Sequence, residues 1–525
     1  MKKLVFVLIL IFISFCVYAQ QKDFDIKSGV LEHYNGIGKN IVIPNGVKVI
    51  GQDAFSGAET LNSVTLPKTL VSIGNGAFSD CINLKTLYFP ETLKEIDDYA
   101  FYNCVNLKDI NFPSSLEKLG SYVFDFCFSL ENIGVNKDNK FFVSCDGVLY
   151  NKDLTEILYY PAGKKIYNVP ETVSRIPDMC FSRSSVETLN IPCSVSEIGN
   201  QAFAECHALK TVIFSVGLKK IGKRAFYGCG NLEEISLPVS LESIDDFCFA
   251  GCSKMNNITI PKNVSFLGEF LFSDCDKLIN IFADEENSYF TSLEGVLLSR
   301  NGEKFIAYPI GRKNEIYNIP STVKEIRSSA FSTAKYIMSL VLTDKVEVLG
   351  DKCFSYMSGL TNIKLSDNLE KIGEYNFTDC QKLVYINLPV KLTYIPKGTF
   401  YSCRNLKSIN LDNIIKVESY AFSGCAELEK AELKNAEFLG SSAFYSCENL
   451  KEVLLSDNLS KIENNAFALC FSLEKINFTN SLSEIGENVF LGCQNLTVTV
   501  DKDSKGAEYC KKNNIEFAEK GNAEK

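Results

Sequence analysis

Apolar and polar positions along this chain recur with a period of 22 or 23 residues. The stretch from Leu84 to Leu107 is one period, and the general pattern is L-x-x-I-x-L-P-x-x-L-x-x-I-x-x-x-A-F-x-x-C. A fixed period in the twenties is typical of a solenoid, in which each repeat buries its apolar face against its neighbours. Fourteen of the sixteen intervals between the motif phenylalanines are 22 or 23 residues long. These phenylalanines are Phe55, Phe78, Phe101, Phe124, Phe181, Phe203, Phe226, Phe249, Phe272, Phe331, Phe354, Phe377, Phe400, Phe422, Phe444, Phe467 and Phe490.

The order of residues within one repeat predicts the shape of one coil. Residues 87–89 alternate apolar and polar, which is the period of a short strand. Pro90 has no amide hydrogen to give a neighbouring strand, so it ends the pairing and turns the chain. Leu93 and Ile96 fit a second short strand, and residues 100–104 have the spacing of a single helical turn. We therefore expect short parallel strands in every coil and one helical turn beside them.

Two intervals are longer than the rest, and they contain a second repeated word. Phe124 to Phe181 and Phe272 to Phe331 both hold an aromatic–x–x–x–acidic–Gly-Val-Leu segment, at residues 142–149 and 290–297. Alternation beside a glycine turn predicts a β-hairpin that extends an enlarged coil. Solenoids also need capped ends, because an end coil has no neighbour on one side. The expected organisation is 1–19 signal peptide, 20–44 N-terminal cap, 45–127 first block of repeats, 128–275 hairpin repeat and second block, 276–495 hairpin repeat and third block, and 496–525 C-terminal cap and tail.

The first nineteen residues predict export rather than structure. Lys2 and Lys3 precede an apolar run from Leu4 to Val17, and the sequence at residues 17–19 fits cleavage after Ala19. No later apolar stretch is long enough to span a membrane, so we expect no transmembrane segment after cleavage. The net charge is -10, and the chain has no basic cluster, so nucleic acid is not an expected partner.

The repeated words resemble those of a known family. Ile198-Gly199 and residues 202–206 (A-F-x-x-C) carry the resemblance, together with the D-G-V-L-Y word at residues 146–150. The chain resembles the BspA-type leucine-rich-repeat proteins of bacteria and some parasitic protists over roughly residues 24 to 517. The resemblance implies a leucine-rich-repeat solenoid at the cell surface or secreted. It further implies attachment to host matrix proteins or to other microbes.

Twenty cysteines in an exported protein raise the question of disulfides. Thirteen of them occupy the last place of the A-F-x-x-C word, where Ala58, Ser184, Ala334 and Met357 also occur. A place that accepts any small or apolar group is typical of a buried hydrophobe, so we expect buried, unpaired thiols. These thirteen are Cys81, Cys104, Cys127, Cys206, Cys229, Cys252, Cys275, Cys380, Cys403, Cys425, Cys447, Cys470 and Cys493.

Neither metal nor catalytic chemistry is indicated. The chain has no C-x-x-C pair, and a straight column of cysteines cannot surround zinc tetrahedrally. His33 and His207 are the only histidines, and the thiol beside His207 is expected to be buried rather than a nucleophile. We therefore expect no catalytic residues, no metal, no cofactor and no enzyme activity.

Outward positions of the strands are the candidate ligand-binding residues. A solenoid repeats the same outward position along a line, which suits an extended protein ligand. We expect a monomer that mediates protein–protein interaction or adhesion, with a host extracellular matrix protein or the surface of another cell as partner. The alternative is a structural envelope or coaggregation protein without a host ligand. The candidate residues are Tyr88, Asn111, Ile213, Ser236, Thr259 and Val341 on the strands, with Tyr159 and Tyr160 on the first hairpin.

Overall fold

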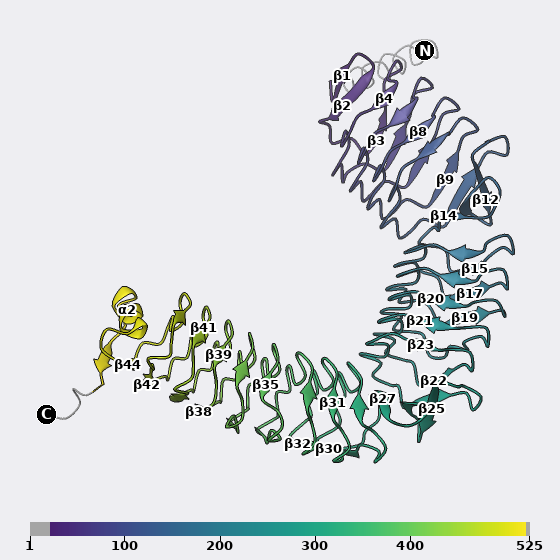
Figure 1. Ribbon diagram of the computed structural model, residues 1–525. Helices are drawn as coiled ribbons and strands as arrows, with labels where there is room; N and C mark the ends of the chain where they lie inside the picture. The colour runs from purple at the N-terminus through teal and green to yellow at the C-terminus, as the bar shows by residue number, and fades with distance from the viewer. Residues whose placement is uncertain (1–21, 521–525) are drawn as a thin grey trace, which may run out of the picture. The chain divides into compact units, whose positions relative to one another are not determined.

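The computed structural model describes residues 22–520, and these form two compact units. One unit ends at Cys252 and the other begins at Ser253. In each unit the chain winds into coils that stack one on the next through short parallel strands (Figure 1). The predicted solenoid is therefore confirmed. The predicted signal peptide, residues 1–19, lies outside the described residues.

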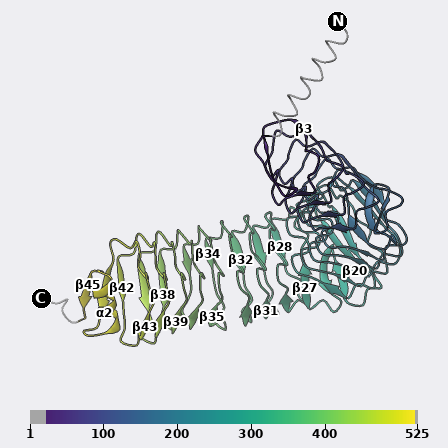
Figure 2. The ribbon, with the colours of Figure 1, turned by 90° about the horizontal axis from the view of Figure 1, so that it is seen from above.

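Regular coils contribute strands to two rows, except that the coil at residues 222–244 has only its second-row strand. First-row strands precede the usual place of the proline, and second-row strands follow it. Figure 2 shows the two rows of the second unit along opposite sides of the stack, with β28, β32 and β34 on one side and β31, β35 and β39 on the other.

In the first unit the first row is β3 (Asn40–Val42), β5 (Ser63–Thr65), β7 (Thr86–Tyr88), β9 (Asp109–Phe112), β11 (Asn132–Val135), β15 (Ile166–Asn168), β17 (Thr188–Ile191) and β19 (Thr211–Phe214). Its second row is β4 (Val49–Ile50), β6 (Ser72–Ile73), β8 (Glu95–Ile96), β10 (Lys118–Leu119), β16 (Arg175–Ile176), β18 (Glu197–Ile198), β20 (Lys220–Ile221) and β21 (Ser243–Ile244).

In the second unit the first row is β22 (Asn257–Ile260), β24 (Asn280–Ala283), β28 (Ile316–Asn318), β30 (Ser339–Val341), β32 (Asn362–Lys364), β34 (Tyr385–Ile386), β36 (Ser408–Ile409), β38 (Lys430–Leu433), β40 (Glu452–Leu455), β42 (Lys475–Asn477), β44 (Thr497–Val500) and β45 (Phe517–Glu519). Its second row is β23 (Phe266–Leu267), β29 (Glu325–Ile326), β31 (Val348–Leu349), β33 (Lys371–Ile372), β35 (Tyr394–Ile395), β37 (Lys416–Val417), β39 (Phe438–Leu439), β41 (Lys461–Ile462) and β43 (Glu484–Ile485).

Each strand residue pairs with the residue at the equivalent position of the next repeat. Val64 of β5 lies beside Leu87 of β7, and Ile73 of β6 lies beside Ile96 of β8. All four side chains are buried. A slip of one residue would turn every buried side chain of a strand to solvent, so the alternation of the sequence fixes this register.

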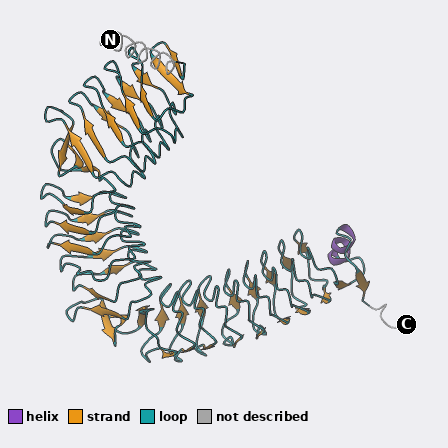
Figure 3. Cartoon of the chain, turned by 180° about the vertical axis from the view of Figure 1, so that it is seen from behind, coloured by secondary structure: helices purple, strands orange, loops and turns teal. Residues whose placement is uncertain are grey.

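The A-F-x-x-C words were predicted to be helical turns, and this prediction is wrong. They form chains of hydrogen-bonded turns, and among residues 22–520 the helix is confined to α2 (Lys505–Lys512), as Figure 3 shows. In all seventeen words the residues two before and two after the phenylalanine have a positive φ, for example Tyr99 (56°) and Asn103 (57°). Seven of these 34 residues are glycine, so the left-handed conformation comes mainly from the setting and not from glycine.

Stacking explains why these words avoid the helix. The amides of Ala54 and Ser56 donate within their own turn, to Gly51 and Asp53. The amide of Phe55, between them, donates to Ala77 of the next coil over 2.7 Å. A helix would direct every amide along its own axis and leave none for the neighbouring coil. Alternating turns therefore extend the inter-coil hydrogen bonding to this side of the stack.

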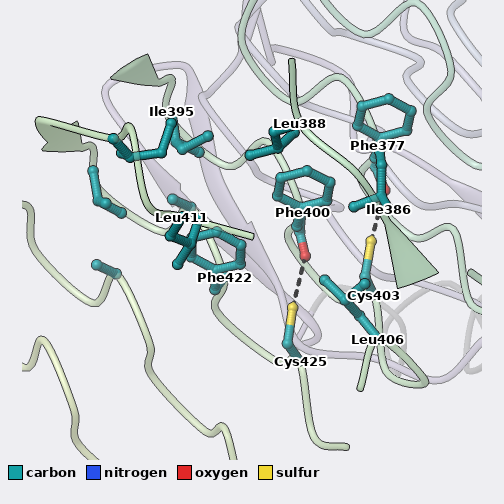
Figure 4. Packing of buried hydrophobic residues seen from close by; sticks show 14 of the residues in the cluster. Phe377, Ile386, Leu388, Ile395, Phe400, Cys403, Leu406, Leu411, Phe422 and Cys425 are labelled. Atoms are coloured by element: carbon teal, nitrogen blue, oxygen red, sulfur yellow. Dashed lines mark hydrogen bonds between the residues drawn. The ribbon is translucent and has the colours of Figure 1, made fainter. Parts of the chain in front are cut away.

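The motif phenylalanines form a buried column with the cysteines beside them (Figure 4). Phe400 stacks on Phe422 with ring centroids 5.3 Å apart and planes 9° from parallel. The thiol of Cys425 donates to the carbonyl oxygen of Phe400 over 3.2 Å, and the thiol of Cys403 does so to Phe377 over 3.0 Å. Burial of the cysteines was predicted and is confirmed for twelve of the thirteen, Cys493 being half-buried. Their hydrogen bonding was not predicted.

Both enlarged repeats are antiparallel hairpins, as expected, and each has a third strand that was not predicted. They consist of β12 (Phe142–Cys145), β13 (Val148–Asn151) and β14 (Ile157–Tyr159), and of β25 (Phe290–Leu293), β26 (Val296–Ser299) and β27 (Lys304–Ala307). A buried asparagine anchors each hairpin to the preceding coil. Asn139 donates to the carbonyls of Pro113 and Leu116, and its own oxygen accepts from two amides of the hairpin. Asn287 makes the same four bonds in the second repeat.

Both ends are capped, as predicted. At the N-terminus β1 (Phe24–Lys27) and β2 (Val30–Tyr34) form an antiparallel hairpin, and β2 continues in parallel onto β4. At the other end α2 packs against β43 and β44, and β45 pairs with β44. The Tyr509 hydroxyl of α2 accepts a hydrogen bond from the Val489 amide over 3.0 Å. The helix and the last strand thus cover backbone groups that a further coil would otherwise bond.

Replacing Phe400 with Ala should lower the local free energy of unfolding by about 3–5 kcal/mol, because the ring leaves a cavity between two stacked neighbours. Tyr401→Ala is the matched control. The Tyr401 side chain is exposed, and its loss should change stability by less than about 0.5 kcal/mol. Hydrogen exchange should show the loss of protection in the coils of Phe377 and Phe422 and little beyond them. A uniform loss across residues 253–520 would contradict nearest-neighbour stacking.

Thiol labelling of the folded protein should be fast at Cys193, which is exposed, and slow at the motif cysteines. Burial raises the pKa of the Cys81 thiol to about 12, so its reactive thiolate is scarce as well as shielded. Denaturation without reductant should make the remaining thiols reactive, as counted by mass spectrometry. Protection that persists in denaturant until a reductant is added would mean that the column is cross-linked.

Candidate binding surfaces

Outward positions of the first-row strands form what we call the strand face of each unit. In the first unit Val42, Thr65 and Tyr88 lie side by side in register on β3, β5 and β7, and Asn111 lies on the neighbouring β9. Tyr88 is 77% exposed and is the most prominent aromatic side chain of this row. The orientation predicted for Tyr88 and Asn111 is therefore what the structure has; whether they bind a ligand stays a prediction.

Two further apolar side chains are exposed singly on the strand face farther along the first unit, two coils apart. Ile213 of β19 is 53% exposed and lies beside Asn190 of β17. Ile166, the first residue of β15, is also exposed, and sequence reasoning missed it. Its neighbour Tyr167 is apolar too, so no alternation marked which of the two faces outward. The buried Tyr167 resolves this, because adjacent strand residues point to opposite sides.

The remaining strand candidates differ in exposure. Ser236 was predicted on a strand, and that placement is wrong: it is exposed but lies in the strand-free segment between β20 and β21. Thr259 of β22 in the second unit is exposed on its strand. Val341 of β30 is half-buried, beside Asn318 and Lys364 in register. Small polar side chains at Ser236 and Thr259 offer a ligand hydrogen bonds but little apolar area.

The two tyrosines of the first hairpin repeat face inward rather than outward. Tyr160 is 3% exposed, lies 4.3 Å from the ring of Phe181, and donates its hydroxyl to the carbonyl of Lys164. Tyr159 packs edge-on against Phe124 and donates its hydroxyl to the carbonyl of that residue. The two rings thus fill the phenylalanine column where the repeat supplies no phenylalanine. Tyr160 is buried and Tyr159 is half-buried at the edge of a cleft, so neither is placed on the strand face as predicted.

A cleft opens where the first hairpin repeat lacks an A-F-x-x-C turn. It has a volume of about 470 Å³ and lies between the turn at residues 119–128 and the turn at residues 177–184. Residues 157–160 and Ala162 line its floor. Both walls belong to the first unit.

Aromatic side chains line one wall of this cleft and continue onto the surface. Tyr122 stacks on Tyr99 of the preceding coil at 5.3 Å, and Phe126 meets Tyr102 edge-on at 5.1 Å. Phe128 packs edge-on against Phe126 at 5.8 Å. We call Tyr99, Tyr102, Tyr122, Phe126 and Phe128 the aromatic wall. Exposed rings in contact across two coils are unusual for a soluble surface and typical of a binding site.

The corresponding gap in the second unit is closed. Its cavity is only about 30 Å³, although the hairpin repeat has the same build. Lys335 pairs with Asp276 at 2.6 Å, Thr333 accepts from the amide of Asp274, and Arg327 donates to the carbonyl of Leu267. The first repeat has Phe126 and Phe128 at the places of Asp274 and Asp276. Hydrogen bonds and an ion pair join the two flanking turns in the second unit, whereas phenylalanine rings occupy the same places in the first unit. This difference explains why one gap is closed and the other is open.

A third hollow lies beside the C-terminal helix and carries charges of both signs. Its volume is about 650 Å³, and its lining includes Lys461, Glu484, Lys505 and Glu508. Lys461 pairs with Glu484 at 3.1 Å and Lys505 with Glu508 at 2.9 Å. Side chains that satisfy each other across an open surface give no indication of a ligand.

Residues 22–520 contain no group of three or more His, Cys, Asp or Glu side chains that could hold a metal ion. His207 is exposed, with Nδ1 3.1 Å from the carbonyl oxygen of Gly228. Over the same residues, no helix is both long and apolar enough to cross a membrane.

Comparison with known proteins agrees with the repeat pattern. A family described as "BspA type Leucine rich repeat region" matches residues 29–147, 174–293, 312–429 and 375–497, which is most of the chain. No curated protein matches. A leucine-rich repeat protein from Eubacterium ventriosum is similar in structure, with 25% identity, a TM-score of 0.53, and coverage of 63% of this chain and 83% of that one.

Two further solved structures show likeness of fold only. A leucine-rich cell surface protein from Faecalibacterium prausnitzii is 22% identical, with a TM-score of 0.40, and the match covers 82% of this chain and 92% of that chain. The pneumococcal vaccine antigen PcpA is 20% identical, with a TM-score of 0.41, and the match covers 94% and 95%.

Proposed function

Because this chain belongs to the BspA-type leucine-rich-repeat family, we propose that it is an exported surface or secreted protein that binds another protein through its strand face. The single observation that carries the proposal is the row of outward strand positions in the first unit. That row presents Tyr88 to solvent, and farther along the unit Ile166 and Ile213 are exposed in the same way. Such a row suits an extended protein ligand rather than a small molecule.

Burial energetics favour the exposed apolar residues as anchors. Covering one large apolar side chain contributes about 1.5–3 kcal/mol, and tyrosine adds a hydroxyl that can hydrogen-bond at the edge of an interface. Their polar neighbours, Thr65, Asn111 and Asn190, supply a rim of hydrogen-bonding groups. An apolar anchor with a polar rim is the usual build of a protein interface.

The partner is a host extracellular matrix protein or the surface of another cell, and the protein acts as a monomer. The family resemblance of the repeat words implies attachment to either partner. Binding to purified matrix proteins and aggregation of whole cells distinguish these two roles.

Tyr88→Ala combined with Ile213→Ala should weaken binding to immobilised matrix proteins by at least about tenfold, because two anchors of about 1.5 kcal/mol or more are lost. Surface plasmon resonance on the purified protein measures this. Tyr356→Ala, which removes a comparably exposed tyrosine from a turn, is the control and should bind normally. Unchanged affinity in the double variant would reject the strand face. Cell aggregation without matrix binding would favour the coaggregation role.

The exported protein should begin at Gln20, because Lys2 and Lys3, the apolar run to Val17 and the small Ala19 together fit a signal-peptidase substrate. Mass spectrometry of protein released from intact cells by surface proteolysis, and of protein in the medium, checks the mature end. Ala19→Phe should slow the cleavage. Protein that keeps Met1 and resists surface proteolysis would argue against export.

A further inference from the structure

One residue that lines the cleft of the first unit carries a carboxylate at a repeat position that is otherwise uncharged. Asp125 directly follows the motif Phe124, a place that Ser, Ala, Tyr, Thr or Leu fills in the other sixteen words. Asp125 is the one charged residue among the seventeen, and it lines the cleft. The corresponding residue of the closed gap is Ser273. A charge confined to the one open gap suggests a role in that gap.

Within residues 22–520, no hydrogen bond or ion pair neutralises the Asp125 carboxylate. Its side chain is partly buried, and burial raises the pKa of its carboxyl, while the positive charge of Arg183 offsets part of that rise. The Arg183 guanidinium is already engaged: it donates to Glu205 over 2.6 Å and lies 5.2 Å from the centre of the Phe126 ring. A partly buried carboxylate without an ion pair is costly to a folded protein.

The other carboxylate of the cleft is satisfied. Asp178 pairs with Arg175 at 2.6 Å and accepts from the amide of Asn200 over 3.1 Å. Asp125 is therefore the group in the cleft whose charge a ligand can complement.

The rings beside Asp125 favour a cation as well. Arg183 already lies over the Phe126 ring, but Tyr122, Phe128 and Tyr159 also line the cleft, and the electron-rich face of an aromatic ring attracts a nearby positive charge. A lysine or arginine side chain has an apolar stem that suits the rings and a charged end that suits a carboxylate. The volume of about 470 Å³ accommodates one such side chain with part of its backbone.

We propose that the cleft between residues 119–128 and 177–184 binds a basic side chain, lysine or arginine, of a protein partner, with Asp125 as the counter-charge and the rings of Tyr122, Phe128 and Tyr159 as its lining. This inference rests on the proposed function in so far as the partner is a protein. The cleft and the strand face are separate surfaces, and each can be tested without the other.

The direct test titrates the purified protein with N-acetyl-lysine methylamide and, as a neutral probe of similar shape, N-acetyl-norleucine methylamide. Methionine methyl groups labelled with carbon-13 report binding by NMR. Met179 is exposed and lines the cleft, whereas Met338 is comparably exposed but lies in the second unit and serves as an internal control. The lysine probe should shift the Met179 signal saturably and leave Met338 unchanged. The norleucine probe should bind at least tenfold more weakly, and the arginine analogue should behave like lysine.

Two variants remove the charge in different ways. Asp125→Asn keeps the shape of the side chain, and Asp125→Ser introduces the residue of the closed gap. Both should weaken binding of the lysine probe at least tenfold. Asp379→Ser, which removes an acidic residue from a turn of the second unit, should leave it unchanged. Equal binding of both probes, undiminished binding to Asp125→Asn, or no saturable Met179 shift in the unaltered protein would each overturn the proposal.

The stability of Asp125→Asn distinguishes a binding role of Asp125 from a structural one. If Asp125 supports the fold, the variant should be less stable than the parent; if it serves a ligand, it should not be. Because the pKa of Asp125 is raised in the folded state, ionisation of its carboxyl lowers stability as the pH rises above the ordinary value of 3.8. The hydroxyl of Tyr159 and the thiol of Cys127 stay neutral beside it, since burial raises the pKa of both, and Arg183 stays charged. Asp125→Asn should therefore be at least as stable as the parent at neutral pH. A clear loss of stability would assign Asp125 to the fold.

Discussion

Backbone amides that bond from one coil to the next set the conditions for the rest of this structure. They run through both strand rows and, by alternating left-handed residues, through the A-F-x-x-C turns as well. Since a regular coil within a unit is held to its neighbour at the strands and at the turn, equivalent residues of neighbouring regular coils are held beside each other. Equivalent positions of neighbouring coils carry similar side chains, so each side chain packs against one of the same type, and phenylalanine stacks on phenylalanine. The hydrophobic core is therefore a consequence of the backbone hydrogen bonding between coils, which is the same from one regular coil to the next.

The coils could be predicted from the period of the sequence, whereas the spacing within one A-F-x-x-C word led to the wrong prediction of a helical turn. The register of Val64 on Leu87 follows from apolar alternation alone. Ala100, Phe101 and Cys104 have helical spacing, yet they face inward from alternating turns because hydrogen bonds to the next coil, which no single repeat contains, decide their conformation. The thiol bond of Cys104 to the Phe78 carbonyl is likewise a property of two coils and not of one.

Candidate binding residues were predictable only where alternation was clear. Tyr88 lies between two apolar positions and faces solvent, as its place indicates. Tyr160 looked available because it is aromatic and near a hairpin, but the hairpin repeat lacks a motif phenylalanine and Tyr160 fills that place against Phe181. Asp125 could have been noticed by comparing the seventeen words position by position. Its significance still depended on seeing that one gap is open and the other closed.

Contact between adjacent coils alone has a consequence for how such a gene can change. Duplication of one whole period inserts a coil that bonds to both neighbours, and no distant residue is disturbed. Duplication of any other length shifts the phenylalanine and the alternating amides out of step, so selection removes it. The hairpin repeats are harder to copy, because Asn139 and Asn287 each bond to carbonyls of a proline-containing coil immediately before them. A block can thus gain or lose a regular coil without disturbing distant contacts, while a hairpin repeat keeps its asparagine anchor only when it is duplicated together with the coil that precedes it.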